Sequence, residues 1–126
     1  MDVLFRFWKF EIEAKFNDSP AASAIYHSLP FTSSVNRWGD EIYFEIPVKL
    51  SLQNGTLDVK IGDIAYWPEG ACLCLFFGKT PASIDDRPRP ASEVNLVGTF
   101  SLSPMLLRKV TPGTSVHVLK SFPTQV

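Results

Sequence analysis

The sequence predicts a single-domain, predominantly β barrel with two short helices. Many short segments alternate apolar and polar residues, turn signals separate them at fairly even spacing, and two stretches carry the capping residues of a helix. At 126 residues the chain can bury roughly 65–70% of its unfolded surface without disulfides or metals. We therefore expect residues 1–126 to form one domain.

The first predicted elements are a β-hairpin and a helix. Val3–Phe7 and Phe10–Phe16 alternate apolar with polar residues, which is typical of strands with one solvated face. Ser19 is expected to cap a helix over 20–29, because proline at the first helical position lacks an N–H that would be unpaired there anyway. Pro30 then ends the helix.

The middle of the chain predicts a series of strands. They are expected at Phe31–Val35, Glu41–Lys49, Thr56–Ile61, Ile64–Trp67 and Ala71–Phe77, with a turn at 36–40. On the second of these strands, Glu41 and Tyr43 share one face, and Ile42 and Phe44 share the other. Ala71–Phe77 is apolar throughout, so it is expected to be buried on both faces.

The last part of the chain begins with the longest irregular segment, residues 79–92. A loop of this length in a small domain is usually functional or mobile. Glu93–Phe100 is predicted as a strand, 103–109 as a short helix capped by a serine, and Ser115–Lys120 as the final strand.

Charge and hydropathy argue against two classes of partner. The net charge is −1, from 12 basic and 13 acidic residues, and no basic stripe is visible, so we expect no nucleic-acid binding. The N-terminus lacks the pattern of a signal peptide, and no apolar run approaches the ~20 residues of a membrane-spanning helix. We expect a cytoplasmic protein with no membrane partner.

The two cysteines, Cys72 and Cys74, lie two residues apart in an apolar run. On a strand both point to the same face, with Cα atoms ~6.6 Å apart, which is poor geometry for a disulfide. His27 and His117 are remote in sequence, and no second cysteine pair exists to complete a metal site. We expect two buried thiols inside the barrel, and neither a metal nor a cofactor.

Aromatic residues and an arginine form the best candidate binding surface. Rings supply contact area and a guanidinium supplies orientation, a combination that suits a peptide or a small molecule. The candidate ligand-binding residues are Arg37, Trp38, Glu41, Tyr66, Trp67 and Phe77, together with the 79–92 loop. The alternative is structural, with Trp67 closing the barrel end and Tyr66 anchoring a loop.

Familiar catalytic patterns are missing from the sequence. It has no nucleophile elbow, no phosphate-binding glycine loop and no metalloprotease histidine pair. Asp40 with Glu41, and Asp85 with Asp86, are adjacent carboxylates, but neighbours on a strand diverge and so cannot converge on one bond. Glu41 lies near Arg37, and we expect the two to pair, either at a groove or as a simple salt bridge.

Four stretches carry a resemblance to a known family. Trp38–Phe44, Gly62–Pro68, Leu75–Pro81 and Val94–Gly98 resemble signature segments of small bacterial and archaeal cyclophilin-like proteins of unassigned function, first known from hyperthermophiles. The resemblance covers nearly the whole chain, in order. It implies an eight-stranded cyclophilin-like β-barrel closed by helices at its ends, and no established reaction.

Three functions remain open after the resemblance. The first is a binding protein without enzymatic activity, which takes a small molecule or a proline-containing peptide. The second is a weak peptidyl-prolyl isomerase, with Arg37 in the place of the cyclophilin arginine and Phe76 or Phe77 in the place of the pocket phenylalanine, although Trp38 and the acidic residues after it depart from the cyclophilin pattern. The third is a structural or homo-oligomeric module that uses exposed aromatic residues such as Trp8.

Overall fold

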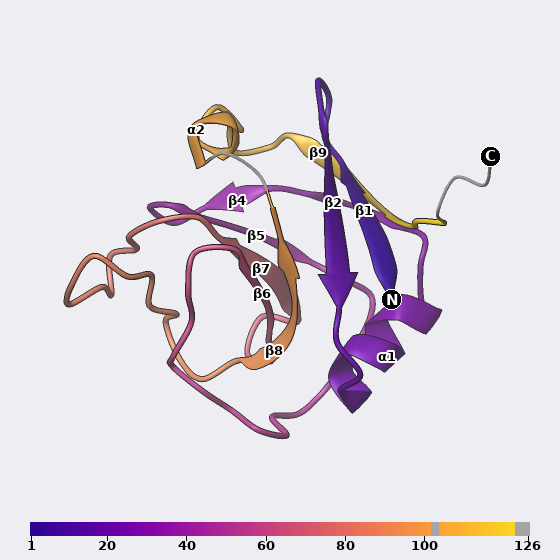
Figure 1. Cartoon of the computed structure of the whole chain (residues 1–126), viewed down its shortest axis with the longest axis horizontal. Helices are drawn as coiled ribbons and strands as arrows, with labels where there is room; N and C mark the ends of the chain where they lie inside the picture. The colour runs from indigo at the N-terminus through magenta and orange to yellow at the C-terminus, as the bar shows by residue number, and fades with distance from the viewer. Residues whose placement is uncertain (102–103, 123–126) are drawn as a thin grey trace.

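Residues 1–101 and 104–122 are described by the structure, a computed structural model, and they form nine strands and two helices. The strands in chain order are β1 (Asp2–Arg6), β2 (Glu11–Phe16), β3 (Phe31–Ser34), β4 (Asn36–Arg37), β5 (Glu41–Glu45), β6 (Asp63–Trp67), β7 (Cys72–Phe76), β8 (Asn95–Phe100) and β9 (Ser115–Lys120). The helices, α1 (Pro20–His27) and α2 (Pro104–Leu107), lie on opposite sides of the sheet in Figure 1.

The strands form one antiparallel sheet that curls into a nearly closed barrel. Their order across the sheet is β3-β9-β1-β2-β8-β6-β7-β5-β4. The two ends of this sheet approach each other where the Ser33 hydroxyl of β3 donates a 2.6 Å hydrogen bond to the Glu45 carbonyl of β5. The predicted mostly-β barrel with two short helices is thus confirmed. The described residues contain nine strands, whereas the resemblance implied eight, and one of the nine, the two-residue β4, pairs with β5 inside the segment predicted as a turn.

Local sequence signals explain two features of the fold. The Ser19 hydroxyl accepts a hydrogen bond from the Ala22 N–H at 3.2 Å, so it caps α1 as predicted, with Pro20 at the first helical position. On β8, Gly98 lies against β2 so closely that a Cβ there would overlap the Lys15 carbonyl oxygen. A glycine at this point therefore lets the backbones of β2 and β8 approach.

Alternating side chains of the strands fill the barrel interior. The main core contains inward-facing residues of every long strand, including Phe5, Phe44, Ile64, Leu73 and Val116. Large aliphatic and aromatic side chains of this kind supply most of the stability of a small domain.

A second buried cluster lies on the outer face of the sheet, beneath the irregular segments. Its members are Val59, Ala65, Cys72, Cys74, Phe76 and Val94. All of β7 is buried, which confirms the prediction that this strand is covered on both faces. The two cysteines are buried and free, but they pack in this outer cluster and not in the barrel interior, which corrects that part of the prediction.

Several predicted elements differ from the structure. The strand predicted over 41–49 ends at Glu45, and the helix predicted over 20–29 ends at His27. The segment 56–61 forms a single bridge, between Thr56 and Val94, and no strand, because Val59 is its only buried side chain. The second helix covers 104–107 instead of 103–109, and its predicted serine cap lies outside the described residues.

Candidate functional site

A pocket on the outer face of the barrel brings together half of the predicted site. Trp38, Glu41 and Trp67 line it, as predicted for a ligand site. We call it the Glu41 pocket, and its lining residues are Trp38, Glu41, Tyr43, Trp67, Cys74, Pro90, Ala91 and Val94. Its volume is about 200 Å³, smaller than the pockets that bury a whole drug-sized ligand.

The period of the strands explains how the walls of the Glu41 pocket arise. On β5, Ile42 and Phe44 point into the barrel, so Glu41 and Tyr43 point outward. Tyr43 pairs across the sheet with Cys74 of β7, which places the phenol and the thiol beside each other on the outer face. Trp67 ends the neighbouring strand β6 and adds a third aromatic ring.

The loop that covers the pocket is fastened by side-chain hydrogen bonds. The Trp67 indole N–H donates to the Ser92 hydroxyl at 2.7 Å, which fixes the ring beneath the loop that carries Pro90 and Ala91. Farther back, the Thr80 hydroxyl donates to the Arg89 carbonyl at 2.5 Å. Two side-chain hydrogen bonds therefore fix the predicted irregular segment 79–92 at Arg89 and at Ser92.

Glu41 is the most unusual residue of this pocket. Its side chain is 6% exposed, and one carboxyl oxygen, Oε1, is buried without a hydrogen-bond partner in the described part of the protein. Burial raises the pKa of Glu41 to about 7, and the Cys74 thiol opposes this shift as a hydrogen-bond donor. Buried polar atoms are nearly always paired, so the unpaired carboxyl oxygen makes this pocket the strongest candidate for a ligand site.

Arg37 does not point into the Glu41 pocket. Its Nε and Nη2 donate to the Gly39 carbonyl at 3.2 and 2.9 Å, and its Nη1 donates to the carbonyls of Arg108 and Val110 at 3.1 and 3.0 Å. The expected pairing with Glu41 is wrong, because the carboxylate that Arg37 faces is Asp40, at 3.7 Å.

Asp40 joins Arg37 to a second arginine. Its Oδ2 accepts hydrogen bonds from Arg108 Nε and Nη2 at 3.2 and 3.1 Å. The preceding Gly39 has φ +61°, in the region that favours glycine, and this lets the chain turn so that its carbonyl meets Arg37. Asp40 lies at the end of the predicted turn 36–40, and its carboxylate also joins Arg37 to Arg108.

Tyr66 and Phe77 also lie outside the Glu41 pocket. Tyr66 is fully buried, and its hydroxyl donates to the Val48 carbonyl at 2.8 Å and accepts from the Leu50 N–H at 3.0 Å. It therefore anchors a loop, which was the structural alternative. Phe77 is 1% exposed, and the Arg37 guanidinium lies over its ring at 5.2 Å.

Several lining residues were missed by sequence reasoning. Tyr43 carried a signal, since it shares a strand face with Glu41. Cys74 was placed in the barrel interior because its strand is apolar throughout and gives no sign of which face is inside. Pro90 and Ala91 belong to the 79–92 loop that was predicted to line the site, whereas Val94, just after this loop, was not predicted.

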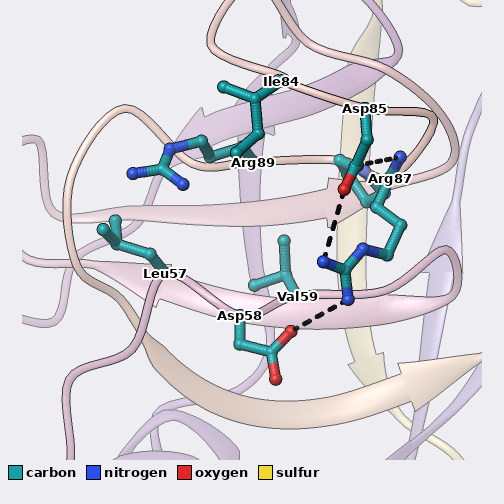
Figure 2. A pocket seen from close by; sticks show the side chains of 8 residues that line it. Leu57, Asp58, Val59, Ile84, Asp85, Arg87 and Arg89 are labelled. Carbon is teal, nitrogen blue, oxygen red and sulfur yellow. Dashed lines mark hydrogen bonds and ion pairs between the residues drawn. The ribbon is translucent and has the colours of Figure 1, made fainter.

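A second depression lies on the surface beside the 84–89 loop (Figure 2). It has a volume of about 320 Å³, and Arg87 stands in its wall between Asp58 at 3.8 Å and Asp85 at 3.4 Å. Backbone hydrogen bonding from Arg87 holds the pKa of Asp85 below its usual value. Arg87 and the two aspartates already pair with one another in solvent, so none of them needs a charged ligand as a partner.

A third hollow lies between the β1–β2 turn and α2. It has a volume of about 470 Å³ and is lined partly by Phe7, Trp8, Phe10 and Leu106. Trp8 is 86% exposed, which makes it the most exposed tryptophan of the chain. The hollow therefore presents apolar surface to solvent.

The remaining candidate groups do not converge. His27 and His117 are exposed, and each ring bonds a hydroxyl or carbonyl of a neighbouring residue. Within residues 1–101 and 104–122, no three His, Cys, Asp or Glu side chains gather as metal ligands. The helices in this same part of the chain are all too short to span a bilayer.

The side chains of the Glu41 pocket offer apolar contacts and hydrogen bonding and no activated nucleophile. Burial and the nearby Glu41 raise the pKa of Cys74 well above its ordinary value, so its thiol is a poor nucleophile at neutral pH. The aromatic rings offer apolar area, and the unpaired carboxyl oxygen offers one strong hydrogen-bond acceptor.

Comparison with known proteins agrees with this fold. The model of a family described as cyclophilin-like matches residues 1–119. The solution structure of a hypothetical protein from Archaeoglobus fulgidus is 42% identical in sequence, covers 96% of this chain and 95% of its own, and superposes with a TM-score of 0.81. Among curated proteins, none matches the chain. By sequence over nearly its whole length, the chain belongs to the cyclophilin-like family.

Proposed function

We propose that this protein is a small-ligand-binding barrel without enzymatic activity, and that the ligand enters the Glu41 pocket. One observation carries the proposal: Glu41 Oε1 is buried, unpaired and part of a pocket wall. Leaving a buried acceptor unpaired costs about 1–3 kcal/mol. A ligand that donates a hydrogen bond to this oxygen recovers that free energy on binding.

The surroundings of Glu41 support the same proposal. Aromatic side chains form much of the wall, and the few polar groups among them can orient a ligand. The loop that covers the pocket is held by the bond between Trp67 and Ser92. A pocket with fastened walls pays less ordering entropy when it binds than one that must first close.

A pocket-filling substitution tests this proposal. Ala91 lines the pocket and is exposed, so Ala91→Phe places a ring in the opening without disturbing the core. Ala82→Phe, in the same loop but outside the Glu41 pocket, is the matched control. We expect a panel of small metabolites and proline-containing peptides to include a compound that raises the melting temperature of the wild type and of Ala82→Phe but not of Ala91→Phe.

The size of the expected effect follows from linkage. A ligand at ~100 times its dissociation constant stabilises the folded state by about 2.7 kcal/mol, which is several degrees for a domain of this length. A compound that stabilises all three proteins equally binds elsewhere and contradicts the proposal. So does a panel of wide chemistry in which nothing binds the wild type.

A second candidate function is self-association through the hollow beside Trp8. Trp8 and Leu106 both line this hollow and are 86% and 39% exposed, and apolar side chains gathered in this way are typical of interfaces. The partner proposed is a second copy of this chain. Light scattering of the wild type and of Trp8→Ser tests it: we expect a dimer that Trp8→Ser converts to monomer, and a wild-type monomer at high concentration removes this candidate.

A further inference from the structure

Resting on the proposed function, we infer that the ligand of the Glu41 pocket is an organic cation, bound through a protonated nitrogen that donates a hydrogen bond to Glu41 Oε1. The inference concerns the chemical class of the ligand. It follows from the charges around Glu41, from the rings of the pocket and from the size of the space.

The charge of Glu41 has no counterpart in the pocket wall. Among the described residues, no Lys, Arg or His side chain lines the pocket. Arg37, next to Trp38, bonds Asp40 and backbone carbonyls, and Arg108 bonds Asp40. Arg89, next to Pro90, lines other depressions of the surface and not this pocket. A buried carboxylate without a cation is costly, so a cationic ligand supplies the positive charge that the pocket wall lacks.

The groups that face Glu41 do not replace such a cation. From β7 it faces the Cys74 thiol, with Cys72 farther along the same face of that strand, from its own strand the Tyr43 phenol, and from the covering loop the apolar Pro90 and Ala91. Both thiols are neutral at pH 7, because burial raises the pKa of Cys72 to about 11 and that of Cys74 well above its ordinary value. None of these groups therefore carries a positive charge that could balance the carboxylate.

Aromatic rings favour the same class of ligand. Trp38, Tyr43 and Trp67 line the pocket, and the faces of such rings attract ammonium and guanidinium groups. The Trp67 N–H is already used by Ser92, so this indole offers the ligand its ring and not a donor. An anion would meet the electron-rich faces and the carboxylate together, and both would repel it.

The volume limits how much of the ligand is enclosed. About 200 Å³ holds a single charged group with a short aliphatic stem, while the exposed Ala91 at the rim leaves a way out for the rest. A free alkylamine and a lysine side chain of a peptide share this chemistry. The unpaired oxygen requires a donor, so an ammonium with at least one N–H fits better than a quaternary one.

The test is a titration that follows the fluorescence of the pocket tryptophans. Butylammonium, neutral butanol, tetramethylammonium and Nα-acetyl-lysine methylamide are each added at pH 8 to the wild type, to Glu41→Gln and to Glu45→Gln. Glu45 lies on the same face of β5 but is exposed and outside the pocket, so Glu45→Gln is the matched control. Circular dichroism of each variant checks that it is folded.

We expect butylammonium to bind the wild type and Glu45→Gln at least about tenfold more tightly than butanol does, and Glu41→Gln to abolish this preference. Tetramethylammonium should bind more weakly than butylammonium. Since the bound cation requires the carboxylate form, its affinity for the wild type should also fall by up to about tenfold per pH unit below pH 7. The relative affinities of butylammonium and the lysine derivative show whether the pocket prefers a free alkylamine or the lysine side chain of a peptide.

Two outcomes overturn the inference, and they differ from failure of the proposed function. If butanol binds this pocket as tightly as butylammonium, the pocket is a ligand site but not one for cations. If Glu41→Gln binds butylammonium as tightly as the wild type, Glu41 is not its partner. When no compound of any charge binds the wild type and Ala91→Phe changes nothing, the proposed function itself fails.

Discussion

The guanidinium of Arg37 lies 5.2 Å from the centroid of the Phe77 ring, with the ring buried beneath it. This is the arginine that the resemblance to cyclophilins offers as a catalyst. A catalytic guanidinium must be free to bond the substrate, yet the N–H groups of Arg37 already donate to the carbonyls of Gly39, Arg108 and Val110. Its geometry is that of a residue that holds the end of α2 to the barrel.

The first prediction follows from that geometry. Arg37→Ala should lower the free energy of unfolding by about 2–3 kcal/mol, because several carbonyl acceptors lose a charged donor. Arg37→Lys should recover little, since an ammonium cannot reach three carbonyls at once. Urea denaturation measures this, with Arg6→Ala as the control, whose exposed ion pair with Glu11 at 3.7 Å should contribute less than about 1 kcal/mol.

The same variants address isomerase activity. In a protease-coupled assay with a proline-containing peptide, the wild type and Arg37→Ala should both show the uncatalysed rate. A wild-type rate above background that Arg37→Ala abolishes, in a folded variant, would restore the isomerase hypothesis.

The second prediction concerns the Tyr66 hydroxyl, which bridges the Val48 carbonyl and the Leu50 N–H. Tyr66→Phe leaves both backbone groups without their partner in a partly buried segment, so it should cost about 1–2 kcal/mol. Hydrogen exchange at the Leu50 amide should accelerate more than exchange in the strands.

Tyr26→Phe is the control for that loss. Tyr26 contacts Lys120 through its ring, at 4.9 Å, and not through a hydroxyl bond among the described residues. Its substitution should leave both stability and exchange at Leu50 unchanged. Equal losses in the two variants would show that the Tyr66 hydroxyl does not anchor the loop.

Period-two alternation accounts for most of what the sequence predicts about this fold. It identifies the strands, and it places Glu41 and Tyr43 together on the outer face of β5. The same rule, applied to β6, separates Tyr66 from Trp67, because neighbours on a strand face opposite ways. The prediction that Tyr66 and Trp67 belong to one binding surface overlooked this rule. In the structure Tyr66 is buried, while Trp67 lines the pocket.

The errors that remain come from long-range packing. An entirely apolar strand such as β7 has no polar face to mark the outside, so the side on which Cys74 lies depends on what covers it. That cover is the 79–92 loop, whose position depends on contacts such as the bond from Trp67 to Ser92, between residues 25 positions apart. The charge partner of Arg37 also depends on the fold. By sequence Arg37 could reach Asp40 or Glu41, and in the structure it faces Asp40, after the turn at Gly39 with φ +61°.

The third prediction is a pH dependence of stability that arises from Glu41. Burial raises the pKa of Glu41 from 4.5 to about 7, so the folded state binds more protons than the unfolded state between these values. The contribution is therefore fully present below pH 4.5, falls as the pH rises and is lost above pH 7. Converted at 1.36 kcal/mol per unit, the loss is about 3 kcal/mol at most.

Urea denaturation at pH 5, 6, 7 and 8 measures this loss. Hydrogen bonding and attraction shift the pKa of Asp2 downward and that of Lys15 upward, and these groups titrate outside the range. Glu41→Gln should flatten the profile, whereas Glu45→Gln should keep its slope. An unchanged slope in Glu41→Gln would falsify the assignment.

The fourth prediction concerns the two free thiols. Burial, helped by the negative charges of Glu45 and Glu41, raises the pKa of Cys72 to about 11, and burial raises that of Cys74 well above its ordinary value. A shift from 9.0 to about 11 reduces the thiolate fraction at pH 8 by about 100-fold. A small thiol reagent should therefore modify the folded protein at least that much more slowly than the urea-unfolded chain, as followed by mass spectrometry.

Because the charge of Glu41 also raises the pKa of Cys74, Glu41→Gln should speed modification at that site in a Cys72→Ser background. Rapid modification of Cys74 in the wild type would show that the Glu41 pocket is open to solvent at its floor, and the carboxylate beside it would then be hydrated and not in need of a ligand.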